Sequence, residues 1–181
     1  MRILRAADHR RMPWKNGRGE TVEIAVFPQG ATVDTFDWRI SMATVSEDGP
    51  FSVFDGIDRT LSILEGAGMA LLVDGCEPVL LTQTSAPHPF PADAPTMAKL
   101  ADGTITDLNV MTRRGRFSHS VDKIVAPVTL GPSAGATLVL CHRGAMRVQN
   151  ETLAALDCAL LETGKAVEIS GDGDGFVIRL F

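Results

Sequence analysis

Short runs in which apolar and polar residues alternate follow one another along the chain. A period of two residues is typical of β-strands, because successive side chains of a strand point to opposite faces. The chain has 181 residues, of which 17 are Gly and 10 are Pro, and these residues separate the runs. The pattern predicts strands at Thr21–Phe27, Trp38–Val45, Thr60–Leu64, Met69–Val73, Val79–Leu81, Ile105–Met111, Ala136–His142, Met146–Val148, Ala159–Leu161 and Phe176–Phe181.

A helical period of 3.6 residues is not sustained over the length of a helix anywhere in the chain. Glu151–Cys158 could hold one or two helical turns at most. Many short strands separated by turn signals predict an all-β sandwich or barrel.

Two segments share one pattern. Leu61–Gly75 runs as strand, glycine turn, strand and glycine turn, and Leu138–Asn150 repeats this order. The unit resembles the core hairpin of cupin jelly rolls, and its repetition predicts a bicupin, with two cupin-like jelly-roll barrels or sandwiches in one chain. We expect residues 1–116 to form an N-terminal half that carries the pocket and residues 117–181 to form a C-terminal half. The two halves would associate tightly and could form one structural unit.

The segment Trp14–Ile24 places a cation, an amide and two glycines directly before a strand. A structural turn needs the glycines, because they accept positive φ angles without steric cost. It does not need Trp14, Lys15 and Asn16 beside them. This combination favours the rim of a small-molecule site.

Three predicted strands each place two polar groups on one face, beside apolar neighbours. These pairs are Thr21 and Glu23 with Phe27, Arg39 and Ser41, and Asp107 and Asn109 with Met111. The polar faces could lie against solvent, as in any half-buried antiparallel sheet. Alternatively, they could line the interior of a barrel as a ligand site. The large side chains and the Trp14–Asn16 rim favour the second interpretation, and place the pocket in the N-terminal half.

Composition excludes several classes of protein. The net charge of −5 does not favour nucleic-acid binding, which needs excess Lys and Arg. No apolar stretch approaches the roughly 18 residues of a membrane-spanning helix, and the N-terminus has no signal-peptide core. The 3 cysteines are scattered, which suits a reducing compartment. We therefore expect a cytoplasmic protein with no membrane partner, and a homodimer stays open.

Metal and nucleophile chemistry lack their sequence signatures. The 4 histidines form no HxH motif, so the usual three or four metal ligands are missing and we expect no metal or cofactor. No GxSxG motif or spaced Cys–His pair indicates a nucleophile. The basic cluster Arg113–Arg116 could be a solvated loop or an anion clamp at the pocket edge.

Several blocks of residues resemble the HutD/Ves family in order and spacing. They are Pro13–Ile24, Phe36–Ala43, Asp48–Ser52, Gly56–Arg59 and Asp107–Arg113. Arg18 departs from the family pattern, in which glycine is more usual. The resemblance implies a cytoplasmic bacterial protein with a bicupin-type fold, no cupin metal ligands and a connection to histidine utilisation. It implies no settled activity, although sensing of a degradation intermediate such as formylglutamate has been proposed for the family.

The faces of the strands and the family blocks together predict one ligand site. Its residues are Trp14, Lys15, Asn16, Thr21, Glu23, Arg39, Ser41, Arg59, Asp107 and Asn109. The arginines suit a carboxylate, so we expect a metal-independent protein that binds a small carboxylated metabolite. The alternative is a metal-independent isomerase or hydrolase with Glu23 or Asp107 as the general base. A structural alternative also stays open, in which Arg39 or Arg59 forms a buried salt bridge with Glu23 or Asp107.

Overall fold

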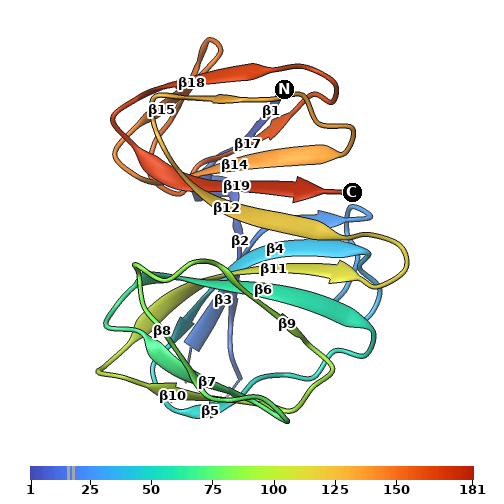
Figure 1. Cartoon of the computed structure of the whole chain (residues 1–181), viewed down its shortest axis with the longest axis vertical. Helices are drawn as coiled ribbons and strands as arrows, with labels where there is room; N and C mark the ends of the chain where they lie inside the picture. Colours follow the sequence, from blue (N-terminus) through green and yellow to red (C-terminus); the bar gives the residue numbers. More distant parts are fainter. Residues whose placement is uncertain (16, 18) are drawn as a thin grey trace. The chain divides into compact units, whose positions relative to one another are not determined.

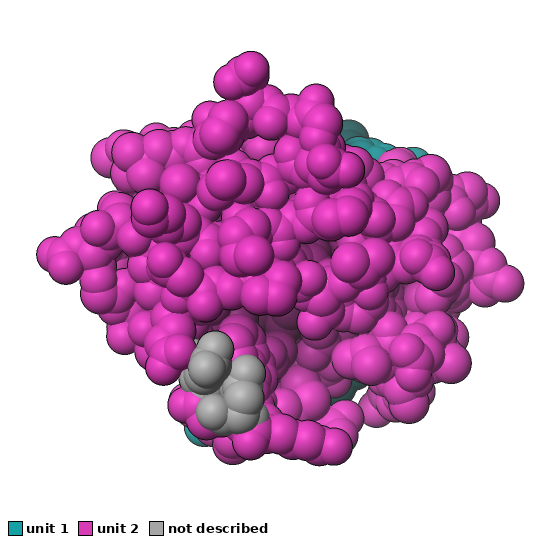
Figure 2. Space-filling model, turned by 90° about the horizontal axis from the view of Figure 1, so that it is seen from below, with its two compact units in different colours: residues 1–9, 119–181 teal, residues 10–118 magenta. Residues whose placement is uncertain are grey.

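The structure, a computed structural model, describes residues 1–15, 17 and 19–181. These residues divide into two compact units, of which unit 1 comprises Met1–His9 and His119–Phe181 and unit 2 comprises Arg10–Ser118 (Figure 2). Apart from one 3-10 turn, η1 (Ala6–Asp8), all regular structure in the described part of the chain is β. The all-β prediction is therefore confirmed. No helix there is long and apolar enough to cross a membrane.

Unit 2 consists of two antiparallel sheets (Figure 1). The 6-stranded sheet has the order β2-β3-β4-β11-β6-β9, from β2 (Arg10–Pro13), β3 (Gly19–Phe27), β4 (Trp38–Val45), β11 (Ile105–Arg113), β6 (Ile57–Glu65) and β9 (His88–Pro91). The 4-stranded sheet has the order β5-β10-β7-β8, from β5 (Gly49–Pro50), β10 (Thr96–Leu100), β7 (Met69–Val73) and β8 (Val79–Leu81). Leu61 and Ile63 of the first sheet pack in one buried cluster with Met69 and Leu71 of the second.

Unit 1 also consists of two antiparallel sheets (Figure 1). The 5-stranded sheet has the order β1-β17-β14-β19-β12, from β1 (Arg2–Leu4), β17 (Cys158–Leu161), β14 (Ala136–Arg143), β19 (Asp174–Leu180) and β12 (His119–Val125). The 4-stranded sheet has the order β13-β18-β15-β16, from β13 (Val128–Leu130), β18 (Val167–Gly171), β15 (Met146–Val148) and β16 (Glu151–Leu153).

Strands β4–β11 of unit 2 and strands β12–β19 of unit 1 pair with one another in the same order. In unit 2 the ladder β4-β11-β6-β9 lies opposite β5-β10-β7-β8, and in unit 1 the ladder β12-β19-β14-β17 lies opposite β13-β18-β15-β16. The repeated hairpins of the sequence are β6–β7 and β14–β15, and each crosses from one sheet of its unit to the other. Gly66 (φ +89°) and Gly144 (φ +68°) lie in these connections, in a conformation that other residues rarely adopt. The sheets of each unit remain separate and do not close into a barrel.

Two local assignments differ from the sequence analysis. Residues 1–9, expected in the N-terminal half, belong to unit 1 because β1 pairs with β17, with Ile3 opposite Ala159. The segment Glu151–Cys158 contains no helical turn. Strand β16 pairs with β15 through three residues, and a turn then leads into β17.

We predict that two glycines with positive φ differ sharply in their tolerance of a side chain. A Cβ atom on Gly68 (φ +109°) would lie 2.2 Å from the carbonyl oxygen of Leu81, where β7 begins to pair with β8. Gly75 (φ +76°) has nothing within 4 Å of such an atom. Gly75→Ala should cost about 1 kcal/mol of unfolding free energy, and Gly68→Ala at least ~3 kcal/mol, because the backbone must also move. Urea denaturation measures both costs. Equal costs would contradict the close approach of Gly68 to the backbone of Leu81.

Candidate functional site

A cavity of about 420 Å³ lies in unit 2, between the inner face of the 6-stranded sheet and the segment 50–54. Its volume is in the range of small-molecule sites. Polar groups from β3, β4, β6 and β11 and aromatic rings from the 50–54 segment share the lining. The lining residues are Trp14, Lys15, Thr21, Ser41, Ala43, Val45, Pro50, Phe51, Ser52, Phe54, Arg59, Asp107, Asn109 and Met111.

Strand register brings the polar residues together on one face. Asn109 of β11 lies opposite Ser41 of β4, and Asp107 lies opposite Ala43. On the other side of β11, Met111 lies opposite Arg59 of β6. Arg59, Ser41, Asp107 and Asn109 are all buried, so the interpretation of these faces as solvated surface is wrong.

Arg59 is the central cation of the cavity. Its side chain is buried, and its guanidinium carbon lies 5.2 Å, 5.3 Å and 5.7 Å from the ring centroids of Phe51, Phe54 and Phe90. The rings favour a cation but supply no hydrogen-bond acceptor in the plane of the guanidinium. One Nη donates a long bond of 3.5 Å to the carbonyl of Ser52, and Nε has no partner. Burial lowers the pKa of Arg59 to about 10, so the group stays charged at neutral pH.

Asp107 is the carboxyl group of the cavity. It is fully buried, and Oδ1 accepts a hydrogen bond from the side-chain amide of Asn109. Oδ2 has no hydrogen-bond partner. Burial raises the pKa of Asp107 to about 7, while the charge of Arg59, the Asn109 amide and the backbone of Ala43 act in the opposite direction. The carboxyl group therefore gains or loses its proton near neutral pH.

Glu23 and Arg39 form a buried ion pair and do not line the cavity. Arg39 Nε donates to Glu23 Oε2 at 2.7 Å, and both side chains are nearly inaccessible to solvent. This corrects the prediction that both residues line the pocket. The structural alternative, a buried salt bridge, describes this pair. Because Glu23 is bonded to Arg39 and does not line the cavity, it is not placed to act as a general base there.

A β-bulge explains why β3 contributes less than expected. The register with β4 shifts between Glu23 and Ala25. The alternation of faces is therefore inverted beyond the bulge. Phe27, expected on the polar face, is exposed and stacks on Trp38 with 5.8 Å between ring centroids. Val26 packs instead against the buried cluster that contains Met111.

The rim of the cavity includes Trp14 and Lys15. The Trp14 indole donates to the hydroxyl of Thr21 at 2.8 Å, which fixes the ring against β3. A side chain on Gly19 would lie 2.2 Å from the carbonyl oxygen of Thr44 and 2.9 Å from the Trp14 ring, so this position requires glycine. Lys15 is exposed and lines the cavity. Asn16, also predicted for the site, lies outside the described residues.

Apart from Trp14, the aromatic part of the lining was not predicted. Phe51, Ser52 and Phe54 lie in a connection without regular structure, where alternation gives no signal. The family block Asp48–Ser52 includes Phe51 and Ser52, and Phe54 lies just beyond it. Met111 was noted as a large side chain on the polar face, and it lines the cavity.

The basic cluster Arg113–Arg116 is not a clamp at the pocket edge. Arg114 bonds Asp58 at 2.7 Å and Asp93 at 2.9 Å. Arg116 bonds Asp37 at 2.9 Å, and Arg113 donates to the carbonyl of Phe36. These arginines hold the ends of strands and loops together. In the described part of the chain, no group of three or more His, Cys, Asp or Glu residues is arranged to hold a metal ion.

Comparison with known proteins gives matches along most of the chain. The family model HutD matches residues 6–178. An uncharacterized 21.2 kDa protein in the hutC 3' region of Pseudomonas putida is 35% identical over 169 residues, which cover 90% of this chain and 87% of that protein. Protein Ves of Citrobacter koseri is 36% identical over 166 residues, which cover 87% of this chain and 83% of that protein.

Solved structures also match along most of the chain. HutD from Pseudomonas fluorescens SBW25, in a structure described by its formate condition, superposes with a TM-score of 0.88 at 31% identity, covering 99% of this chain and 97% of that chain. At the level of fold alone, a cupin 2 conserved barrel domain protein from Leptotrichia buccalis has a TM-score of 0.59 at 9% identity, covering 94% of this chain and 91% of that chain. The all-β fold is therefore cupin-like.

We predict that the Arg39–Glu23 pair contributes to folding. Arg39→Ala would leave the Glu23 carboxylate buried without its partner, which typically costs about 3–5 kcal/mol of unfolding free energy. Arg11→Ala is the matched control, because Arg11 bonds Glu20 at 2.8 Å on the neighbouring strand but is 67% exposed. The control should cost less than about 1 kcal/mol. Chemical denaturation measures both, and an Arg39→Ala protein of unchanged stability would contradict the assignment.

Proposed function

Since this chain belongs to the HutD family, we propose that it is a binding protein for a small carboxylated metabolite of histidine degradation, with formylglutamate as the first candidate. The protein would recognise this ligand without a metal ion and act as a sensor or regulator. The connection to histidine degradation is supported by the relative in the hutC region of Pseudomonas putida.

The observation that carries the proposal is the incomplete bonding of Arg59. A buried guanidinium needs acceptors for its N–H groups, and here Nε has none and one Nη has only the 3.5 Å bond to Ser52. A carboxylate offers two acceptors in the geometry that the guanidinium fork matches. The three aromatic rings exclude water from the faces of Arg59, which strengthens a charged hydrogen bond there.

The remaining lining suits the rest of such a ligand. Formylglutamate carries two carboxylates and one formamide group. Lys15, at the rim, offers a second cation, and Ser41, Thr21 and Asn109 offer hydrogen-bond groups for the formamide.

The wider architecture and compartment belong to the same proposal. We interpret the repeated pairing of β4–β11 and β12–β19 as a bicupin in which one half carries the site. The protein would work in the cytoplasm, where histidine degradation intermediates arise, with no nucleic-acid or membrane partner. A homodimer is compatible with this role.

A thermal-shift assay with Arg59→Met tests the proposal. Wild-type protein at 100 times the dissociation constant of formylglutamate should gain about 2.7 kcal/mol of stability. In Arg59→Met the affinity should fall about 10- to 150-fold, since a hydrogen-bonded charge contributes roughly 1.5–3 kcal/mol. The variant should nevertheless keep its stability without ligand, because replacing a desolvated cation by an apolar chain of similar length removes a burial cost.

Arg114→Met is the control, since this exposed arginine lies outside the cavity. It should bind formylglutamate as wild type does. Equal stabilisation of Arg59→Met and wild type would contradict the assigned role of Arg59. If histidine, urocanate, imidazolone propionate, formylglutamate and glutamate all fail to stabilise wild type, the histidine-pathway ligand is wrong.

A second candidate function rests on Asp107. A buried carboxyl group with a pKa of about 7 is suited to general-base catalysis at neutral pH, and Arg59 could stabilise a developing negative charge. The reaction would be a metal-independent isomerisation or hydrolysis. NMR spectra of each stabilising compound after long incubation separate the two functions. Unchanged ligand favours binding, and consumption that is lost in Asp107→Asn favours the enzyme.

A further inference from the structure

Asn109 has a fixed orientation in the wall of the cavity. Its side-chain amide nitrogen donates a hydrogen bond to Oδ1 of Asp107, which lies two residues earlier on the same face of β11. A carboxylate oxygen only accepts hydrogen bonds, so the nitrogen of the Asn109 amide, and not its oxygen, is turned toward Asp107. Because the amide is planar, its oxygen lies on the side away from Asp107.

The direction of this bond is the same in both charge states of Asp107. Oδ2 has no hydrogen-bond partner, so it is the oxygen that can carry a proton. Oδ1 then remains an acceptor for the Asn109 amide. Asp107 is fully buried, so water does not compete for the bond. Asp107 is therefore a positioning residue for Asn109.

The oxygen of the Asn109 amide is left as an open acceptor. Among the described residues it accepts no hydrogen bond, although Ser41 lies directly opposite on β4. It is not one of the unpartnered side-chain atoms that solvent cannot reach, which include Arg59 Nε and Asp107 Oδ2. Since Asn109 lines the cavity, this oxygen is accessible to a ligand there.

Arg59 supplies an open donor close to this acceptor. Nη2 donates the long bond to Ser52, whereas Nη1 has no partner in the part of the chain that the structure describes and is not among the atoms closed to solvent. Arg59 lies opposite Met111, which follows Asn109 on the same face of β11. Arg59 and Asn109 are thus diagonal neighbours, whose Cβ atoms are typically about 7–8 Å apart or somewhat less. One small ligand can therefore contact both side chains.

We propose that Asn109 accepts a hydrogen bond from an N–H group of the ligand while Arg59 binds a carboxylate of the same ligand. This inference rests on the proposed function and narrows the ligand class to acids with an N–H donor near the carboxylate, such as N-acyl amino acids. In formylglutamate the donor is the formamide N–H. Asp107 acts through Asn109, because it prevents the amide from turning its nitrogen toward the ligand. An acid with an oxygen in place of the N–H would face the Asn109 oxygen with a second acceptor.

Isothermal titration calorimetry of the wild-type protein with two matched ligands tests the proposal. One ligand is formylglutamate, and the other is 2-formyloxyglutarate, in which an ester oxygen replaces the N–H and every other group is kept. The ester should bind about 5- to 150-fold more weakly, because a buried acceptor loses its donor. Titrations at pH 7 with freshly prepared ester limit its hydrolysis. Equal dissociation constants for the two ligands would overturn the proposal.

Asn109→Leu removes the acceptor at nearly constant side-chain volume. The variant should lose affinity for formylglutamate but not for the ester, so the ratio of the two dissociation constants should approach 1. Asn150→Leu, which changes an exposed asparagine of unit 1, is the matched control and should keep the wild-type ratio. A wild-type ratio in Asn109→Leu would assign the discrimination to another residue and overturn the proposal.

Asp107→Asn tests the positioning role. Its amide can donate or accept, so Asn109 becomes able to turn its nitrogen toward the cavity. The preference for formylglutamate over the ester should shrink, whereas a merely structural role of Asp107 would weaken both ligands equally. Asp122→Asn, which changes an exposed carboxylate of unit 1, is the control and should keep the wild-type ratio. An unchanged ratio in Asp107→Asn would overturn the positioning role.

The outcomes separate this inference from the proposed function. If wild type binds both ligands equally and Arg59→Met weakens both, the binding function stands and the role of Asn109 is wrong. If neither ligand binds to wild type, the binding function and this inference are both wrong.

Discussion

The burial of Arg59 and Asp107 without a bond between them is the constraint on which the site depends. Taking either charge out of water is costly, and a direct ion pair would be the usual compensation. Unit 2 uses that solution elsewhere, in the buried Arg39–Glu23 pair. In the cavity, compensation is partial: aromatic rings surround the cation, and one amide bonds the carboxyl group. In the proposed function, a ligand carboxylate would complete the bonding of Arg59, and such a site would discriminate strongly against ligands that lack the right acceptors.

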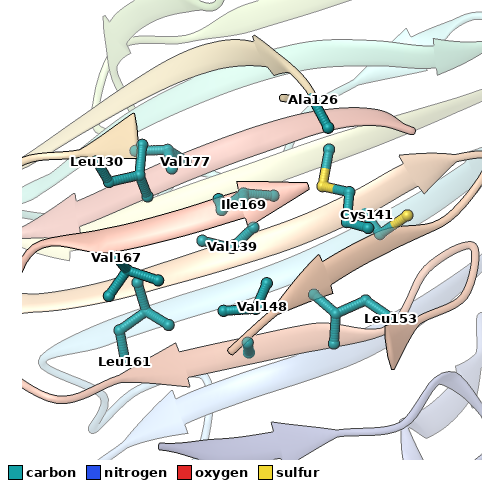
Figure 3. Close-up of a cluster of buried hydrophobic side chains, with 12 residues drawn as sticks. Ala126, Leu130, Val139, Cys141, Val148, Leu153, Leu161, Val167, Ile169 and Val177 are labelled. Atoms are coloured by element: carbon teal, nitrogen blue, oxygen red, sulfur yellow. The ribbon is translucent and has the colours of Figure 1, made fainter. Parts of the chain in front are cut away.

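The two units show that strand order alone does not make a cavity. Unit 1 has the same pairing scheme, but its inner space is filled by side chains such as Val139, Cys141 and Val177 (Figure 3). In its central ladder Val139 lies opposite Val177 and Cys141 opposite Gly175, where unit 2 places Asp107 and Asn109 on the equivalent strand. Apolar side chains can pack tightly against one another. Charged side chains resist tight apolar contact, so the space beside them is not filled. One fold therefore yields a packed core in one unit and a polar cavity in the other.

The sequence predicted the features that depend on alternation and missed those that depend on tertiary contacts. The long strands β4 and β11 follow the predicted boundaries closely, and the shared faces of Ser41, Asp107 and Asn109 follow from their spacing. The bulge in β3 leaves no mark in the pattern, so Phe27 was assigned to the wrong face. Short strands such as β5 and β16 form because a partner strand is present, and propensity does not reveal them.

The sequence also did not reveal which charged residues form ion pairs with each other. Nothing in the spacing distinguishes Arg39, which pairs with Glu23, from Arg59, which has no carboxylate bonded to it among the described residues. The aromatic rings around Arg59 come from a connection near β5 and from β9, so only folding brings them together. Ligand assignment to either arginine therefore needed the structure, whereas the family itself could be identified from the short sequence blocks.

The central claim is that the hydrogen-bonding capacity of the buried Arg59 guanidinium is left for a ligand carboxylate. A crystal structure of the protein with formylglutamate tests it most directly. The account predicts a ligand carboxylate within hydrogen-bond distance of the Arg59 guanidinium, with the Arg39–Glu23 pair intact. A complex in which Arg59 bonds Asp107 directly, and the ligand lies elsewhere, would contradict it.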